Sequence, residues 1–201
     1  MTEKVWHKFW PKGAPKTFDY PELPVGAIIR GSAERFGDRE ALVYNDRSWT
    51  YRQVYEQSLR FANALKHKGI GKGDVVAIHM MNIPQYAFAY YGILLSGATF
   101  TPVNPLLPPA DLAYQLNDSG AKVVIPHELV AKAVQAIQAN TQVRWVLVTG
   151  ESEAMHDKPV DTSACGEQWN SLLEVINQFP AEEIDVAIEP RKDLAHLAYT
   201  G

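Results

Sequence analysis

Two stretches of this 201-residue chain combine glycine with hydroxyl or charged side chains, the composition of loops that bind nucleotide phosphates. The first is GIGKGD, residues 69–74. A dinucleotide-binding loop follows a strand and opens a helix, whose N-terminus then faces the phosphate. Here an amphipathic helical pattern precedes the glycines and an apolar strand pattern follows them. We therefore interpret this stretch as a helix cap and a tight turn into Val75, with no phosphate-binding role.

The second stretch is Tyr199-Thr200-Gly201, at the end of the chain. The apolar run before it predicts a strand over residues 194–199 that could lie in the centre of a sheet. Ligands of open α/β sheets bind at the carboxyl ends of the strands. Backbone N–H groups beside a hydroxyl and a glycine can approach a polyphosphate. Because of their position at a strand end, we predict Thr200 and Gly201 as nucleotide-binding residues.

Histidines and carboxylates are the other candidates for chemistry. His79 ends a predicted strand with no carboxylate partner nearby, so we interpret it as a packed, hydrogen-bonded core residue; a ligand at the sheet edge is the alternative. The six histidines show no shared metal-ligand spacing. Acidic clusters at residues 151–153 and 182–183 predict solvated surface. Cys165 is the single cysteine, which excludes an internal disulfide framework. We predict no catalytic residue and no metal ligand in this chain.

Alternating strand and helix patterns would position these residues. Thr50 can cap an amphipathic helix over residues 51–68, which Gly69 ends. Before it, we predict a helix at 25–36 and a hairpin around Asn45-Asp46. Further predicted strands cover 75–79, 98–103, 122–125 and 143–148, with helices at 83–95, 109–116, 127–139 and 169–179 and a surface loop at 149–167. This alternation predicts an α/β fold with a mostly parallel sheet flanked by helices.

The helix predicted at residues 83–95 is apolar on nearly every side, which is typical of a buried helix. Asn82 precedes it and Pro84 lies in its first turn, so Asn82 is predicted to cap the helix.

We divide the chain into an arm, residues 1–24, and an α/β body, residues 25–201. Prolines prevent a long helix in the arm, and its aromatic side chains are predicted to lie across the surface of the body. Lysine recurs at every fourth position from Lys4 to Lys16. Weak contact of this basic arm with a membrane surface is the alternative interpretation.

Composition excludes several classes of protein. A hydrophobic content of 46% is enough for a core, and a formal net charge of -4 argues against nucleic-acid binding. We find neither a secretory signal nor an apolar run of the ~20 residues that span a bilayer. With one cysteine, these features predict a soluble, cytoplasmic protein.

Three stretches resemble, in order, the adenylate-forming (AMP-binding) superfamily. SWTYRQV, residues 48–54, is similar to the family's early TY-x-E-L motif, although Gln53 and Val54 replace its Glu-Leu. GILLSGATFTPVN, residues 92–104, is similar to its L-x-x-G-A-x-x-x-P-[LVI]-[ND] segment. DLAHLAYTG, residues 193–201, resembles the strand that opens its phosphate loop. The resemblance covers the chain from about Leu23 onward, and PKTFDYP and NPL look most like long-chain fatty acyl-CoA ligases.

This resemblance implies the N-terminal subdomain of the acyl-CoA synthetase-like fold. It also implies a parent enzyme that uses ATP, Mg²⁺ and CoA to activate a fatty acid through an acyl-adenylate. The residues Tyr86, Phe88, Tyr90, Tyr91 and Gly92 would then either line an acyl tunnel or form plain core. An aryl- or medium-chain acyl-CoA ligase, and a non-catalytic α/β interaction module, are alternatives.

Only Thr200 and Gly201 match the family's phosphate loop, so we expect a chain truncated at the start of that loop. We expect it to be inactive alone and to hold no cofactor tightly. Apolar surface exposed by truncation could drive homo-oligomerisation.

Overall fold

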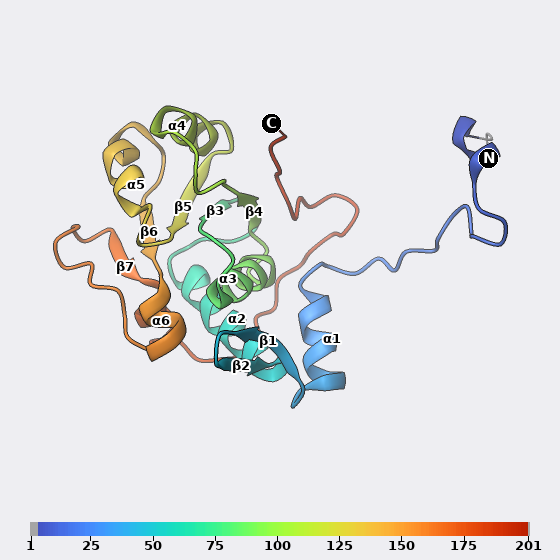
Figure 1. The fold of residues 1–201 in the computed structure, drawn as a ribbon, viewed down its shortest axis with the longest axis horizontal. Helices are drawn as coiled ribbons and strands as arrows, with labels where there is room; N and C mark the ends of the chain where they lie inside the picture. The colour runs from blue at the N-terminus through green and yellow to red at the C-terminus, as the bar shows by residue number, and fades with distance from the viewer. Residues whose placement is uncertain (1–3, 201) are drawn as a thin grey trace.

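The computed structural model describes residues 4–200, and its body has one parallel sheet between two layers of helices (Figure 1). Five strands pair in the order β4-β3-β5-β6-β7, every pair parallel. They are β3 (Val75–His79), β4 (Thr99–Pro102), β5 (Ala121–Pro126), β6 (Trp145–Val148) and β7 (Trp169–Ser171). The predicted α/β class and the mostly parallel sheet are therefore confirmed.

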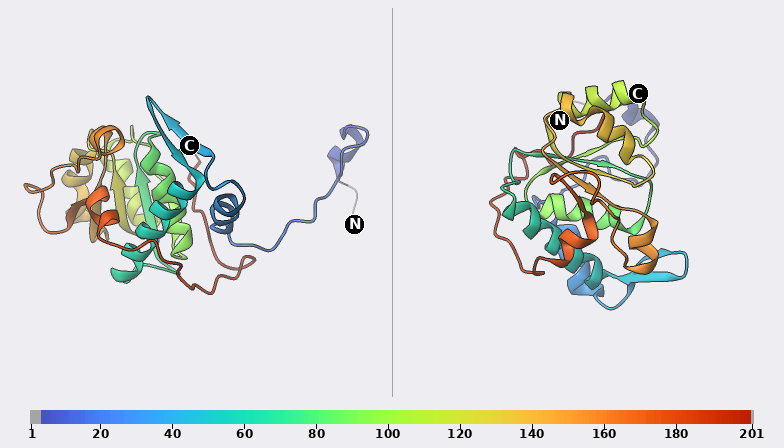
Figure 2. Two further views of the ribbon diagram at one scale, coloured as in Figure 1. Left: turned by 90° about the horizontal axis from the view of Figure 1, so that it is seen from below. Right: turned by 90° about the vertical axis from the view of Figure 1, so that its left-hand side faces the viewer.

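Helices cover both faces of this sheet (Figure 2). On one face lie α2 (Tyr51–His67), α3 (Pro84–Leu95) and α7 (Leu172–Asn177), which pack against Val76 and Ile78 of β3. On the other face lie α4 (Pro109–Asp118) and α5 (Ala131–Ile137), which pack against Ala77 of the same strand. The alternation of buried side chains along β3 thus supplies two separate cores.

Strand order reverses between β3 and β5, because the connection through α3 leads to one side of β3 and the connection through α4 leads back to the other. At such a switch point a crevice forms outside the carboxyl ends of the strands, where ligands of this fold class bind. His79 ends β3 and lies at this point. Its carbonyl accepts a hydrogen bond from the His127 N–H, which follows β5, at 3.0 Å.

Local capping explains why α2 begins where the sequence predicts. The Gln53 N–H donates to Thr50 Oγ1 at 3.2 Å, and the Thr50 N–H donates to Gln53 Oε1 at 2.8 Å. This reciprocal pair satisfies two N–H groups that the first helical turn leaves without partners. Gly69, with φ of 67°, ends the helix as predicted.

Ahead of α2 lie α1 (Ala27–Phe36) and a two-stranded antiparallel sheet, β1 (Glu40–Tyr44) and β2 (Arg47–Thr50). Asn45 turns the hairpin with φ of 51°, in the left-handed region that asparagine tolerates. The predicted helix and hairpin are confirmed.

Three predictions in the second half of the body are wrong in part. Residues 149–167, predicted as surface loop, contain the helix α6 (Glu151–His156). Residues 169–179, predicted as one helix, begin with β7, and the Ser171 hydroxyl then caps α7 by accepting from the Glu174 N–H at 3.1 Å. The helix predicted to start at His127 starts at Ala131 and is followed by the short 3₁₀ helix η2 (Gln138–Asn140). Elements of three to seven residues are too short for periodicity to identify.

The arm runs away from the body (Figures 1 and 2). It contains one 3₁₀ helix, η1 (Val5–Phe9), and its other described residues are extended or in turns. An ion pair between Glu22 and Arg191 ties its end to the body. Over residues 4–23 the prediction that the aromatic side chains lie across the body is therefore wrong. Pro11, Pro15 and Pro21 remove backbone donors and keep the segment from folding back as a helix.

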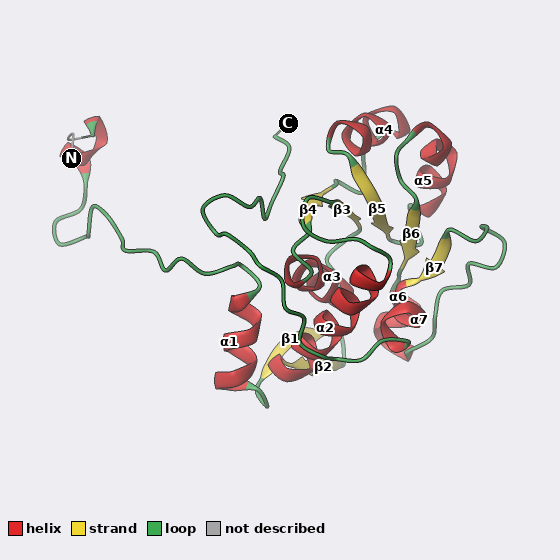
Figure 3. Ribbon diagram, turned by 180° about the vertical axis from the view of Figure 1, so that it is seen from behind, coloured by secondary structure: helices red, strands yellow, loops and turns green. Residues whose placement is uncertain are grey.

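The chain after α7 is a long loop that passes along α2 and α1 before it reaches the sheet edge (Figure 3). Asn63 Nδ2 donates to the Glu182 carbonyl at 2.8 Å, and Arg30 pairs with Glu183 at 2.7 Å. Lys72 pairs with Asp193 at 2.7 Å near the start of β3. The surface position predicted for residues 182–183 is confirmed, and these contacts deliver residues 194–200 to the edge of the sheet.

Candidate functional site

The segment predicted as the last strand lies beside β4 and runs parallel to it. The Phe100 N–H donates to the Ala195 carbonyl, and the Leu197 N–H donates to the Phe100 carbonyl, both at 2.9 Å. The hydroxyls of Thr99 and Thr101 donate to the carbonyls of residues 194 and 197, both at 2.8 Å. Side-chain hydroxyls thus fix this segment in addition to the backbone.

The prediction of a central strand over residues 194–199 is corrected by this geometry. The segment forms one isolated bridge, between His196 and Phe100, at the edge of the sheet. Leu194 and Tyr199 are exposed. A strand is central only when another strand pairs with its outer side, and residues 4–200 supply none there. The parallel direction agrees with the prediction, whereas the full strand and its burial do not.

Thr200 follows this segment as an exposed residue, and Gly201, the other predicted nucleotide-binding residue, lies outside the described residues. The Tyr199 hydroxyl donates to Asp118 Oδ2 at 2.6 Å, which ties the end of the chain to the last residue of α4. Desolvation and the Asp118 carboxylate raise the pKa of Tyr199 to about 12, so this hydroxyl stays a donor at neutral pH. A role for Thr200 and Gly201 in binding phosphate stays a prediction.

Aromatic side chains surround a hollow where α3 meets β4. Tyr86, Tyr90 and Tyr91 from α3 and Phe100 from β4 line an open space of about 380 Å³. The ring centroids of Tyr90 and Phe100 lie 5.1 Å apart at 88°, the edge-to-face arrangement that aromatic pairs prefer. Desolvation raises the pKa of all three tyrosines, so their hydroxyls are neutral.

His196 connects this hollow to the terminal segment. Its Nε2 lies 2.8 Å from the Tyr90 hydroxyl, and its ring packs edge-on against Phe100 with centroids 5.2 Å apart. An apolar hollow with a few polar groups at its rim is the usual composition of a small-molecule site. The side chain of His196 therefore has a structural role that its position before Thr200 alone could not identify.

Replacing Tyr90 by phenylalanine is expected to loosen the terminal segment, because the hydrogen bond to His196 is lost. A bond of this kind contributes about 1 kcal/mol, so hydrogen exchange at the Leu197 amide should accelerate about fivefold. The control is Tyr91→Phe, which leaves the bond to His196 intact and should leave that amide unchanged. Equal exchange rates at Leu197 in the Tyr90→Phe variant and the unmodified chain would show that Tyr90 does not hold the segment.

Of the five residues that could line a tunnel, the structure separates two from the hollow. Phe88 faces the opposite side of α3 and packs against Trp49, with ring centroids 6.1 Å apart. Gly92 lies against α2, where an added Cβ would come within 2.7 Å of Phe61 and 2.9 Å of the Ser58 carbonyl. Phe88 and Gly92 are core residues, whereas the three tyrosines line the hollow.

Two expectations about the end of β3 and the loop that follows it need correction. His79 is fully buried, as expected, but among residues 4–200 neither of its ring nitrogens has a hydrogen-bond partner, so it is packed without being hydrogen-bonded there. Burial lowers the pKa of this imidazole, which keeps it neutral. Asn82 does not cap α3, because Ile83 occupies the N-cap position; Asn82 lines the aromatic hollow instead.

A buried carboxylate was missed by the sequence patterns. Glu153 was predicted as solvated surface, yet 3% of the residue is exposed. Its carboxylate accepts hydrogen bonds from the hydroxyls of Thr149 at 2.7 Å and Ser171 at 2.6 Å, and from the Val160 N–H at 3.2 Å. Burial raises the pKa of Glu153 although these three bonds oppose the shift. The carboxylate therefore joins α6 to the ends of β6 and β7.

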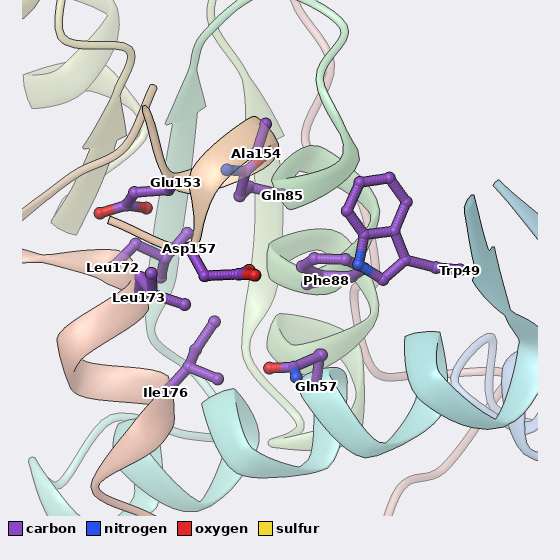
Figure 4. A pocket seen from close by; sticks show the side chains of 10 residues that line it. All are labelled: Trp49, Gln57, Gln85, Phe88, Glu153, Ala154, Asp157, Leu172, Leu173 and Ile176. Carbon is purple, nitrogen blue, oxygen red and sulfur yellow. The ribbon is translucent and has the colours of Figure 1, made fainter. Parts of the chain in front are cut away.

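Glu153 also borders a small pocket of about 40 Å³ between α2, α3, α6 and α7 (Figure 4). Figure 4 shows Glu153 and Asp157 on one side and Phe88 and Trp49 on the other. Gln85, nearly fully buried in its wall, donates from Nε2 to the Gly150 carbonyl at 3.3 Å, and its Oε1 has no partner within the described part of the chain. The volume is enough for about three water molecules, so this pocket suits water that completes the bonds of Gln85.

The glycine stretch at residues 69–74 has the structural role predicted for it. Gly73 adopts φ of 88°, and the Asp74 carboxylate accepts from the Gly71 N–H at 2.9 Å. Lys122 pairs with the same carboxylate, and these contacts lower the pKa of Asp74 against the opposing effect of burial. The turn lies at the start of β3, at the sheet edge opposite to the carboxyl ends of the strands.

The described part of the chain has neither a cluster of metal-ligating residues nor a helix that could span a membrane. Residues 4–200 contain no group of three or more His, Cys, Asp or Glu arranged to hold a metal ion. Within the same residues, no helix has both the length and the apolar character needed to cross a bilayer.

The model of the AMP-binding enzyme family matches residues 29–201, which is most of the chain. The chain therefore belongs to the AMP-binding enzyme family, and the resemblance found in its motifs is confirmed.

Relatives within this family include enzymes named long-chain-fatty-acid–CoA ligase. The long-chain-fatty-acid–CoA ligase of Bacillus subtilis is 27% identical over 223 residues, covering 100% of this chain and 38% of that protein. The enzyme of the same name from Yersinia pestis is 36% identical over 150 residues, covering 73% of this chain and 26% of the relative. The crystal structure of a long-chain-fatty-acid-CoA ligase (FadD1) from Archaeoglobus fulgidus superposes with a TM-score of 0.78 at 25% identity, over 92% of this chain and 36% of that one.

These alignments also define how much of each relative is represented. The chain spans between 26% and 38% of the length of the proteins just named. Each of these ligases is therefore much longer than the 201 residues aligned with it.

Proposed function

We propose that these residues form the N-terminal subdomain, residues 25–201, of an ATP-dependent, AMP-forming ligase that joins a long-chain fatty acid to CoA. The arm, residues 1–24, precedes it. The observation that carries the proposal is the parallel pairing of residues 194–197 with β4, which leads the chain to Thr200 on the side of the sheet where the strands have their carboxyl ends. The motifs of the chain and the names of its relatives support the same reaction.

Such a site must overcome the repulsion between two negatively charged reactants. A fatty acid carboxylate attacks the α-phosphate of ATP and expels pyrophosphate, which gives an acyl-adenylate, so an anion must approach a polyanion. The thiol of CoA then attacks the acyl carbonyl and displaces AMP, which gives the thioester. Backbone N–H groups and hydroxyls preorganised around the phosphates stabilise the charge that develops. We propose that Thr200 and Gly201 contribute the first of these groups.

Mg²⁺ would supply further charge neutralisation as the partner of ATP. The donor set of residues 4–200 does not fit a resident metal site, since the cluster of carboxylates or histidines that it requires is missing from them. We therefore assign no metal ligand to this chain.

The aromatic hollow is the proposed contact for the acyl chain. Its wall is formed by rings from α3 and β4. Burial of a hydrocarbon chain against such apolar surface is favourable by about 25 cal/mol for each Å² removed from water. Tyr86, Tyr90 and Phe100 would contact the chain, and His196 would couple its occupancy to the segment before Thr200. Exposed apolar surface of this kind would also let two copies of the 201-residue polypeptide associate, and the hollow would then be closed to an acyl chain.

We also propose a cytoplasmic location, because the single, free Cys165 provides no disulfide framework. The polypeptide of these 201 residues alone is proposed to be inactive, because two residues of a phosphate loop cannot surround a triphosphate.

The assay that tests this function uses the full product of the gene. Pyrophosphate exchange and thioester formation are measured with fatty acids from medium to long chain, with aromatic acids and without any acid. The proposal expects both activities to be highest with long chains. A preference for aromatic or medium-chain acids would assign one of the alternative ligases. Neither activity with any acid would favour an interaction module.

A further inference from the structure

The arm presents apolar side chains to solvent along its whole described length. Large side chains that a globular protein normally buries are exposed here: Phe9 is 80% exposed and Tyr20 is 77% exposed, and Val5, Trp6 and Phe18 are exposed as well. Figures 1 and 2 show this segment extending away from the body. Exposed apolar surface set apart from a domain marks a contact site for another molecule.

Basic side chains alternate with these apolar residues. Residues 4–23 contain four lysines, at positions 4, 8, 12 and 16, and two acidic residues, Asp19 and Glu22. The whole chain has a formal net charge of -4, so the positive arm is attached to an acidic body. An anionic surface would attract the arm and repel the body, which defines the orientation of the molecule on it.

Two of the lysines lie over aromatic rings of the arm. Lys4 Nζ is 5.7 Å from the centroid of the Trp6 ring, and Lys8 Nζ is 4.9 Å from the centroid of the Phe9 ring. A ring with an adjacent ammonium group matches the boundary of a lipid bilayer, where the ring enters the level of the headgroups and the ammonium remains at the phosphates. Lys12 and Lys16 continue the positive charge along the arm.

We propose that residues 4–23 are a docking segment for an anionic lipid surface. The proposal does not depend on the ligase function, because it concerns the arm and not the sheet. A lipid surface has negatively charged headgroups above an apolar interior along the whole length of an extended segment. A protein groove would need a separate complementary group for each lysine and each aromatic ring. The segment lacks a long amphipathic helix, so its binding is reversible and depends on salt.

Vesicle sedimentation of the 201-residue chain tests this proposal without ATP or fatty acid. The chain should bind vesicles that contain phosphatidylglycerol, bind pure phosphatidylcholine much less, and be released by high salt. Trp6 and Trp10 should show a blue-shifted emission on binding. Joint replacement Lys4→Gln, Lys8→Gln, Lys12→Gln and Lys16→Gln should weaken binding by about fivefold for each lysine, the ratio that corresponds to the typical interaction of one basic residue with such a surface.

The matched control removes four lysines from the body: Lys66→Gln, Lys68→Gln, Lys132→Gln and Lys158→Gln. Because the body lies outside the proposed contact, this variant should change the affinity less than about twofold. A second variant, Trp6→Ser with Trp10→Ser, should keep the preference for anionic vesicles but lose the blue shift.

Three outcomes would overturn the proposal. The first is equal binding to neutral and anionic vesicles. The second is an equal loss of affinity in the arm and body lysine variants. The third is a dimer, seen by analytical ultracentrifugation, that requires the arm while vesicle binding is undetectable; a second copy of the chain would then be the partner.

Discussion

Replacing Glu153 by alanine is expected to lower the free energy of unfolding by about 2 kcal/mol. The carboxylate accepts from the hydroxyls of Thr149 and Ser171 and from the Val160 N–H, and all three donors lose their partner in the variant. A buried donor without a partner costs about 1–3 kcal/mol. Part of that cost is offset because a buried negative charge is removed at the same time. Urea unfolding followed by circular dichroism measures the difference.

Glu153→Gln is the matched control, because the amide keeps the size of the side chain and one of its acceptor oxygens. Burial raises the pKa of Glu153 in the folded protein above the value of 4.5 for an exposed glutamate. Between these two values the folded chain binds more protons than the unfolded chain, so the glutamate protein loses stability as pH rises through this window. The glutamine variant should lack this loss. Parallel pH profiles for the two proteins would contradict the burial of a titrating carboxylate at this position.

Gly92→Ala is expected to destabilise the chain by a similar amount, about 2 kcal/mol, for a steric reason. The new Cβ would lie 2.7 Å from the ring of Phe61, which is fully buried, and 2.9 Å from the Ser58 carbonyl of α2. Neither neighbour can move freely, so the two helices must separate, and overpacking of this kind costs about 1–3 kcal/mol. Thermal unfolding should show a midpoint lower by roughly 6 °C for a chain of this size.

Gly31→Ala provides the contrast within the same molecule. Gly31 lies in α1, and a Cβ there would meet nothing within 4 Å. This variant should therefore be more stable than the unmodified chain by about 0.5–1 kcal/mol, since alanine favours the helix over glycine. If both alanine variants changed stability in the same direction, the close packing of α2 on α3 would not be the reason for glycine at position 92.

The sequence predicted the parallel sheet because its signals are local and strong. Apolar runs mark the four strands β3 to β6, and Thr50 and Gly69 mark the two ends of α2. Each of these signals depends on a few neighbouring residues, so no knowledge of the tertiary structure is needed. The same holds for the turn at residues 69–74, where the order of helix, glycine and strand was enough to exclude a phosphate loop.

Other features depend on partners that are distant in sequence. Glu153 is buried because Thr149 and Ser171 lie beside it at the ends of two strands, and a cluster of acidic residues in a polar tract does not reveal that arrangement. The helix α3 is apolar on every side, so its pattern could not separate Tyr90, which lines the hollow, from Phe88, which packs in the core.

The segment before Thr200 was predicted in the right direction but not in the right form, and the binding role of Thr200 and Gly201 stays a prediction. The resemblance directed attention to Thr200, and the pairing of His196 with Phe100 agrees with the expected direction of the segment. Its position at the sheet edge could not be predicted, because burial of a strand depends on neighbours outside its own sequence.

We propose that Thr200 begins the loop that holds the phosphates of ATP, and one substitution probes this role. In the full product of the gene, Thr200→Ala should lower the rate of fatty-acid-dependent pyrophosphate exchange by about a hundredfold, the effect of removing one donor from a charge-stabilising site. Thr200 is exposed, so the thermal midpoint should not change. An exchange rate equal to that of the unmodified enzyme would contradict the assignment of this residue to the phosphate loop.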